Sequence, residues 1–244
     1  TREAILDATE ELLRQLVSSN DVDADDLATA IDNVIDGEGE INTGNPYGMP
    51  KKDRDGWLKE AGVEKMTKGK QYDFLFWVGC SGVYDARIHK VTKTLANIMQ
   101  ASGLRFGVLG SRELCCGEWI RRAGAEIQYQ ELVKKNIAIL NEYEVKYIVT
   151  FCPHCFNTLK NEYSEFGSEF KVYHHSQLSC LLRHSVQAYG TVVYHDPCYL
   201  ARHNDILSEP RDVLDRIRMT SIVEAKQCGK NAFCCGGGGG QAFM

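Results

Sequence analysis

The stretch Tyr147-Ile-Val-Thr-Phe-Cys-Pro-His-Cys155 carries the pattern on which the fold rests, a short apolar run that passes directly into a cysteine motif. Runs of β-branched and aromatic residues of this length are typical of buried strands. Similar runs occupy residues 74–78, 105–109, 170–174 and 191–195. Helical patterns lie between them, over residues 84–98, 119–143 and 176–188. Short strands that alternate with helices predict βαβ units, and therefore an α/β fold with parallel sheets.

Composition and charge exclude two classes of partner surface. The chain has 244 residues, with 28 Lys and Arg against 33 Asp and Glu, so its formal net charge is −5. This mild acidity argues against a basic stripe for nucleic acid or anionic lipid. No apolar run approaches the ~18 residues that span a bilayer. We therefore expect a cytoplasmic protein that binds no nucleic acid.

Three segments differ in character along the chain. Residues 1–36 carry two apolar stripes at helical spacing, and residues 37–56 are dense in Gly, Asn and Pro. The first residues form neither a signal peptide nor an initiating Met, so we expect the chain to begin after processing, inside a longer polypeptide or at the first ordered residue. We predict a helical arm and linker, a first cysteine-rich half-domain and a second one, over residues 1–70, 71–189 and 190–244.

The ten cysteines follow a repeated spacing. The first set, at intervals of thirty-four and thirty-five residues, is Cys80, Cys115-Cys116-Gly117 and Cys152-x-x-Cys155. The second set, again thirty-five residues apart, is Cys198 and Cys234-Cys235-Gly236. Such a repeat predicts an internal duplication, in which two half-domains of similar topology bring their cysteines to one edge. A disulfide scaffold is not expected, because the chain carries no secretory signal and cytosolic thiols are kept reduced.

The number and adjacency of the cysteines indicate the kind of site. A cubane iron–sulfur cluster and a structural zinc ion each take four cysteines, whereas the first set holds five. Cys115 and Cys116 are neighbours, and cannot easily give two ligands to one small tetrahedral ion. They can bind two irons of a larger cluster. A large or unusual iron–sulfur cluster therefore fits better than zinc, and a zinc-stabilised scaffold without redox function stays open as the alternative.

The first set resembles the CCG-type cysteine-rich domain of heterodisulfide reductase catalytic subunits and their relatives. The sequence segments around the cysteines also resemble this domain, namely Trp77-Val-Gly-Cys-Ser81, Cys152-Pro-His-Cys-Phe-Asn-Thr-Leu-Lys160 and His195-Asp-Pro-Cys-Tyr199. Gly44-Asn-Pro-Tyr-Gly48, with Arg54 and Trp57, resembles the segment before this domain in larger members, such as electron-transfer-flavoprotein:menaquinone oxidoreductases. The resemblance covers roughly residues 41–244. Together with the duplication, it implies two pseudo-repeated Rossmann-like half-domains after the helical arm.

The resemblance further implies a redox subunit that holds a noncubane [4Fe-4S] cluster and passes electrons to a disulfide or related sulfur substrate. The ligands of this cluster would be Cys80, Cys115, Cys116, Cys152 and Cys155. A second cluster would use Cys198, Cys234 and Cys235. The Cys-x-x-Cys expected about thirty-five residues after Cys235 is not reached before Met244, so either the sequence is truncated or the second site is incomplete. The catalytic residues would be Cys115, Cys116 and His154. His154 would protonate a leaving thiolate or hydrogen-bond a cluster sulfur, and a role in positioning the loop is its alternative.

The implied partners deliver and receive electrons. The chain has no ferredoxin-type Cys-x-x-Cys-x-x-Cys run, so the donor would be a ferredoxin-like or flavin-containing subunit. A membrane quinone-reactive subunit would attach the protein to the inner face of the membrane. In that case the chain would act as an electron-transfer module of a membrane electron-transfer-flavoprotein:menaquinone oxidoreductase-like complex, without a substrate of its own.

Several other residues fall outside the repeated spacing. Cys180, in a predicted helix, is expected to be a small core residue. Cys228 is either a loop thiol or a substitute ligand six residues before Cys234. His195 and His203, like His154, would either act on a cluster sulfur or a leaving thiolate, or only position their loops. Five glycines at 236–240 show no phosphate-binding signature, and we expect them to let the backbone approach a cluster closely.

Overall fold

The structure is a computed structural model and describes residues 44–178, 187–238 and 241. The helices expected within residues 1–36 and the side chain of Cys180 lie outside the described residues. No helix in the described part of the chain is long and apolar enough to cross a bilayer.

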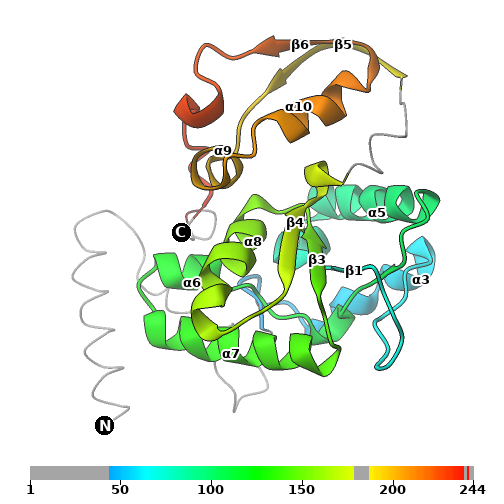
Figure 1. The fold of residues 1–244 in the computed structure, drawn as a ribbon, viewed down its shortest axis with the longest axis vertical. Coiled ribbons are helices and arrows are strands. Elements are labelled where there is room, and N and C mark those ends of the chain that lie inside the picture. The colour runs from blue at the N-terminus through cyan, green and yellow to red at the C-terminus, as the bar shows by residue number, and fades with distance from the viewer. Residues whose placement is uncertain (1–43, 179–186, 239–240, 242–244) are drawn as a thin grey trace.

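A four-stranded parallel sheet organises the first half of the chain (Figure 1). Its strands are β1 (Phe74–Phe76), β2 (Phe106–Gly107), β3 (Tyr147–Thr150) and β4 (Lys171–His174), in the order β2-β1-β3-β4. The register pairs Leu75 with Gly107 on one side and with Ile148 on the other. The connections run through the helices α4 (Gly79–Tyr84), α5 (Ala86–Ala101), α6 (Glu118–Arg122), α7 (Glu126–Glu142) and α8 (Pro153–Asn157). The predicted α/β fold with parallel strands is therefore confirmed.

Both faces of this sheet are buried, because successive side chains of a strand point to opposite sides. Leu75 and Trp77 pack in the cluster that contains the side chains of α6 and α7. Phe76 and Val78 pack in a second cluster with α5 and with Trp57, which lies just before α3 (Leu58–Ala61). The first half is thus a three-layer helix–sheet–helix sandwich. The cysteines lie at the carboxyl ends of its strands.

A smaller parallel sheet follows, formed by β5 (Gln187–Tyr194) and β6 (Arg218–Glu224). Between the two strands run α9 (Cys198–Asn204) and α10 (Ser208–Asp215), and α10 packs against β6 (Figure 1). The order of strand, cysteine-bearing helix, second helix, strand and Cys-Cys-Gly repeats the order of the first half. On the other face of this sheet, Tyr189, Val193, Met219 and Val223 stay exposed.

The structure differs from the expected elements in several places. The helix predicted over residues 176–188 is not formed at its two described ends, because 175–177 are a 3-10 turn, η5 (His175–Gln177), and Gln187 pairs with Arg218 in the second sheet. The helix predicted over 119–143 is divided between α6 and α7 at Gly124, whose φ of 88° ends the first helix. Strand β6 was not predicted, because its mostly exposed side chains give little apolar signal. The loop expected at 37–56 contains a 3-10 helix, η1 (Lys51–Asp55).

Two histidines at the end of β4, His174 buried and His175 partly exposed, predict a loss of stability in mild acid. His174 is 4% exposed, and its Nε2 donates to the carbonyl of Phe151 at 3.0 Å while Nδ1 accepts from Ser176. Burial lowers the pKa of His174 to about 4 and that of His175 to about 3. The unfolded chain, with histidine pKa values of about 6.5, therefore takes up protons first as the pH falls. The stabilisation is complete above pH ~6.5 and declines towards pH ~4, by roughly 1.4 kcal/mol per pH unit for each histidine.

Urea unfolding at several pH values between 7.5 and 5 measures this loss. His174→Gln removes one of the two titrating groups, so its free energy of unfolding should depend less steeply on pH than that of the wild type. Equal slopes in the two proteins would show that His174 is not held neutral by the fold.

Candidate metal centre

Five cysteines of the first half line one cavity of about 170 Å³. Cys80 lies in the first turn of α4, Cys115 and Cys116 precede α6, and Cys152 and Cys155 lie at the start of α8. All but Cys152, which is partly exposed, are at most 8% exposed. The three loops come together because each follows a strand of the same parallel sheet, or in the case of Cys115 and Cys116 a short turn after β2.

The five sulfurs are linked in a row, and they are not gathered around one point. Side-chain hydrogen bonds link Cys80 to Cys115, Cys115 to Cys116, Cys116 to Cys155 and Cys155 to Cys152. No disulfide joins the nine cysteines that the structure describes. Within the same residues, no group of three His, Cys, Asp or Glu side chains converges in the manner of a single-ion site. The arrangement is therefore one of several thiols around a shared cavity.

Hydrogen bonding divides these thiols into two kinds. Hydrogen bonds from Cys115 and Cys155 lower the pKa of Cys116 to about 7, although burial opposes this shift. A hydrogen bond from Cys155 holds the pKa of Cys152 well below its usual value. The pKa values of Cys80 and Cys155 are raised, first by the bonds they make to neighbouring sulfurs and then by burial. Cys116 and Cys152 therefore lose their protons more readily than the other three thiols. Metal cations that displaced the protons of those three would bind all five cysteines as thiolates.

The Cys115-Cys116 pair is held through its backbone. The N–H of Cys115 donates to the carbonyl of Gly44 at 2.9 Å, and Asn136 Nδ2 donates to the carbonyl of Cys115 at 2.8 Å. The Tyr163 hydroxyl donates to the carbonyl of Cys116 at 3.0 Å and accepts from Asn136 at 2.9 Å. Both side chains are buried. Sequence reasoning missed Asn136 and Tyr163; the amide of Asn136 on the buried face of α7 was a signal that such a partner exists.

The Cys80 loop rests on a buried ion pair. Glu113 accepts from the N–H groups of Val78 at 3.0 Å and Gly79 at 2.7 Å, and from Arg54 Nη1 at 2.9 Å. Arg54 Nη2 in turn donates to Cys80 Sγ at 3.2 Å. Arg54 and Glu113 are each 1% exposed. No sequence motif points to Glu113, whereas Arg54 belongs to the segment that resembles larger family members.

His154 lies between the two halves of the chain. Burial alone would lower the pKa of His154, but its hydrogen bond to Cys152 and the charges of Cys152, Glu118 and Cys235 raise it to about 9. Its ring meets that of Tyr199 edge-on, with centroids 5.1 Å apart. A Cβ on Gly238 would lie 2.9 Å from Nε2 of His154, so the glycine run passes closely over this histidine. Gly237 also lines the cavity of the five cysteines, and the close approach of the glycine run to a cluster stays a prediction.

The second set of cysteines repeats part of this geometry. Gly236 donates its N–H to Cys234 Sγ at 3.4 Å, as Gly117 does to Cys115 Sγ at 3.4 Å, and both glycines have positive φ. Cys198 begins α9 and is partly exposed, while Cys234 and Cys235 are exposed. The remaining candidates lie elsewhere. Cys228 is partly exposed before η7 (Gly229–Asn231), and His195 is exposed. The His203 ring lies tilted against that of Tyr199, with centroids 5.0 Å apart.

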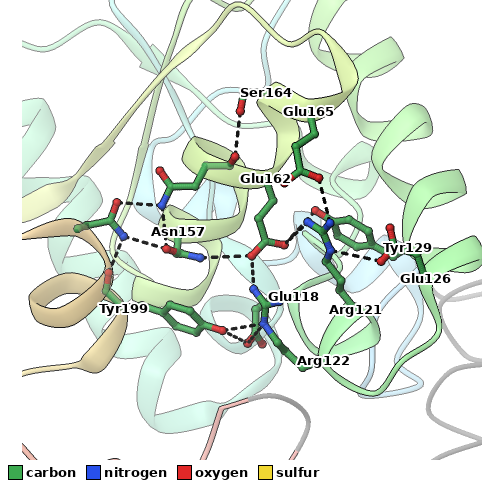
Figure 2. A network of polar contacts seen from close by, with 12 residues as sticks. Glu118, Arg121, Arg122, Glu126, Tyr129, Asn157, Glu162, Ser164, Glu165 and Tyr199 are labelled. Carbon is green, nitrogen blue, oxygen red and sulfur yellow. Dashed lines mark hydrogen bonds and ion pairs between the residues drawn. The ribbon is translucent and has the colours of Figure 1, made fainter.

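Figure 2 shows a network of polar contacts around a buried carboxylate, Glu162. Glu162 closes a π-helical turn, η3 (Thr158–Glu162), that continues α8, and it accepts from Arg121, Arg122, Tyr129 and Asn157. The Arg122 Nε also donates to the hydroxyl of Tyr199, which donates to Glu118 at 2.8 Å. The network therefore joins α6, the helix that carries Cys155, and α9 of the second half.

Glu162→Gln is expected to lower the free energy of unfolding by about 2–3 kcal/mol. The variant keeps the shape but leaves Arg121 and Arg122 without this counter-charge; the loss is below the ~3–5 kcal/mol of a fully buried pair because both arginines are partly exposed. Glu165→Gln is the matched control, since Glu165 pairs with the same Arg121 but is 53% exposed, and should cost less than about 1 kcal/mol. Chemical denaturation of both variants measures the difference. Equal losses would show that the network does not hold the site.

Comparison with known proteins agrees with this geometry. The cysteine-rich domain (CCG) family matches residues 74–160 and 192–244, one segment in each half of the chain. "Probable iron-sulfur-binding oxidoreductase FadF" of Bacillus subtilis is 39% identical over 214 residues, which are 82% of this chain and 30% of that protein. "EtfAB:quinone oxidoreductase" of Syntrophomonas wolfei is 36% identical over 82% of this chain and 29% of its own length. One subunit of the dihydromethanophenazine:CoB--CoM heterodisulfide reductase of Methanosarcina barkeri is 29% identical over 80% of this chain and 49% of its own length.

These relatives are larger proteins, of which the chain spans between 29% and 49%. No solved structure matches the chain significantly. The family match covers more than half of the residues and includes the cysteines of both sets. The resemblance inferred from the cysteine spacing is confirmed, and the chain belongs to the CCG cysteine-rich domain family.

Proposed function

We propose that the five cysteines of the first half hold a noncubane [4Fe-4S] cluster, and that the chain serves as an iron–sulfur subunit of an oxidoreductase. The observation that carries this proposal is the convergence of five sulfurs from three loops on one cavity of about 170 Å³. The ligands would be Cys80, Cys115, Cys116, Cys152 and Cys155. When bound, such a cluster supplies single-electron transfer, which thiols alone do not provide.

The donor set favours a cluster over zinc. A structural zinc site takes four ligands around one point, whereas these sulfurs are spread along a hydrogen-bonded chain. The adjacent Cys115 and Cys116 are both buried against the cavity, so both would be used by a group with several irons. The names of the relatives support the same class of chemistry, because they include an iron-sulfur-binding oxidoreductase, a quinone oxidoreductase and a heterodisulfide reductase subunit.

We further propose that the substrate is a disulfide or a related sulfur compound. Reduction of a disulfide breaks one S–S bond and consumes two electrons and two protons to give two thiols. His154, hydrogen-bonded to Cys152 and with its pKa raised to about 9, would hold a proton beside the cavity for a departing thiolate. The cavity wall formed by Trp119 and Pro46 would limit access of water to the sulfurs.

The proposed partners are a ferredoxin-like or flavin-containing donor and, by analogy with the relative named as a quinone oxidoreductase, a quinone-reactive membrane subunit. The second set, Cys198, Cys234 and Cys235, would contribute to a second cluster. Because Gly237, two residues after Cys235, lines the cavity of the first set, the second site would lie next to the first. A pure electron conduit, without its own substrate, is the second candidate function.

The test combines visible absorbance with electron paramagnetic resonance of protein purified without oxygen. A disulfide-reducing centre should be coloured, and a small thiol added to the oxidised protein should produce a new resonance. A conduit would be coloured but insensitive to the thiol. A colourless protein with zinc would contradict the proposed cluster altogether.

A further inference from the structure

A charged side chain from outside the cysteine motifs contacts the proposed ligand set. Arg54 lies in η1, twenty-six residues before Cys80 in sequence, and its Nη2 donates to Cys80 Sγ at 3.2 Å. The guanidinium is 1% exposed and its Cζ lies 5.3 Å from the centroid of the Tyr84 ring. A buried cation this close to a sulfur is not a solvated surface charge.

The surroundings fix Arg54 in this position. Its other terminal nitrogen donates to Glu113, and the two oxygens of Glu113 are also occupied by the N–H groups of Val78 and Gly79. The carboxylate therefore has three donors of its own, while the Cys80 sulfur receives its hydrogen bond from the arginine. Arginine stays protonated at any physiological pH, so the charge beside the sulfur is permanent.

We infer that Arg54 is a positioning residue of the metal centre, which acts through Cys80 to hold the reduction potential of the bound cluster high. The inference rests on the proposed function, because it requires a cluster on Cys80. Hydrogen bonds to cluster sulfurs and the charges around them set such potentials. A fixed positive charge in a buried site stabilises the reduced form, which carries one more negative charge than the oxidised form. The segment before the cysteine-rich domain is thereby part of the redox centre.

A purely structural role predicts something different. If Arg54 served only to pair with Glu113 and fix the Cys80 loop, its replacement would lower stability or cluster loading but leave the potential of loaded protein unchanged. The reduction potential, measured on protein with full iron content, therefore distinguishes the two roles.

Arg54→Gln keeps hydrogen-bonding capacity and removes the charge. We expect a cluster whose reduction potential is lower by about 59 mV or more, the value that corresponds to a tenfold change in the equilibrium constant of a one-electron couple. Arg54→Lys retains the charge and should return the potential towards that of the wild type. Arg105→Gln is the matched control, because Arg105 pairs with Asp73 on the surface, with 67% of its side chain exposed, and should leave the potential unchanged. A fully loaded Arg54→Gln protein with the wild-type potential would overturn the inference.

A measurement on the unaltered sequence covers the case in which Arg54→Gln does not fold. Wild-type protein labelled with ¹⁵N-arginine should show a magnetic coupling between a guanidinium nitrogen and the paramagnetic cluster, and unlabelled protein should not show that ¹⁵N signal. If the cluster is present but this coupling is absent, the inference about Arg54 is wrong and the proposed function is not affected. Wild-type protein that holds no iron would instead contradict the proposed function.

Discussion

Cys115→Ser is expected to lose most of its iron and to be inactive in dye-linked electron transfer, while its helices remain formed. The Cys115 thiol is 4% exposed, lines the cavity and takes part in the hydrogen-bonded chain of sulfurs. Serine keeps the shape of the side chain, so packing and an altered buried polar group cost only about 1–3 kcal/mol. Loss of a ligand has a larger effect, because cluster binding adds to folding energy only when all ligands converge. Iron content, the resonance spectrum and circular dichroism measure these three consequences.

Cys180→Ser is the control for this substitution. Cys180 lies outside the repeated spacing and outside the described residues, and we predict that it is a core residue rather than a ligand. The variant should keep its colour, iron content and activity, with a melting temperature lowered by a few degrees. If Cys180→Ser were bleached while Cys115→Ser remained brown and active, the ligand assignment would be wrong.

Gly117→Ala is expected to lower stability by roughly 2–5 kcal/mol and to impair loading of the cluster. Gly117 has a φ of 86°, a conformation that costs an L-residue about 1–2 kcal/mol. Its added Cβ would also lie 2.8 Å from Cδ2 of Tyr129, a fully buried ring whose hydroxyl is bonded to Glu162. Such overpacking adds about 1–3 kcal/mol. Relief of the contact would displace the Cys115-Cys116 turn from the cavity.

Gly124→Ala separates the two causes. Gly124 has nearly the same φ, 88°, but a Cβ there would meet no atom within 4 Å. It should therefore show only the conformational cost of about 1–2 kcal/mol and bind iron like the wild type. Thermal unfolding and iron analysis of both variants test this comparison. Equal effects would mean that the contact with Tyr129 does not position the cysteine turn.

Much of the first half of the fold was predictable because its strands are buried on both faces. A strand covered on two sides reads as an unbroken apolar run, and the run that ends at Val78 is of this kind. Strand β6 had no such signal, since Met219 and Val223 face outward on a sheet with one exposed face. The division between α6 and α7 was missed because the apolar spacing continues across Gly124. The domain limits at residues 70 and 189 stay predictions.

The cysteines of the candidate site could be predicted from the sequence, but the residues that hold the cysteine loops in place could not. The spacing of Cys80, Cys115 and Cys152 placed each thiol after a strand, and parallel strands bring such positions to one edge. Glu113 and Asn136 act instead through contacts between distant segments, the hydrogen bonds to Gly79 and to the carbonyl of Cys115. Such contacts depend on side-chain orientation in the folded chain, which neither spacing nor periodicity encodes. The assignments of ligands and of His154 as a catalytic residue stay proposals.

Metal and sulfide analysis of protein purified without oxygen decides whether the five cysteines of the first half hold an iron–sulfur cluster. We expect a brown protein with roughly four irons and four acid-labile sulfides for each occupied site, and bleaching on exposure to air as thiolates and sulfides oxidise. A colourless protein with one equivalent of zinc and no iron would contradict the cluster.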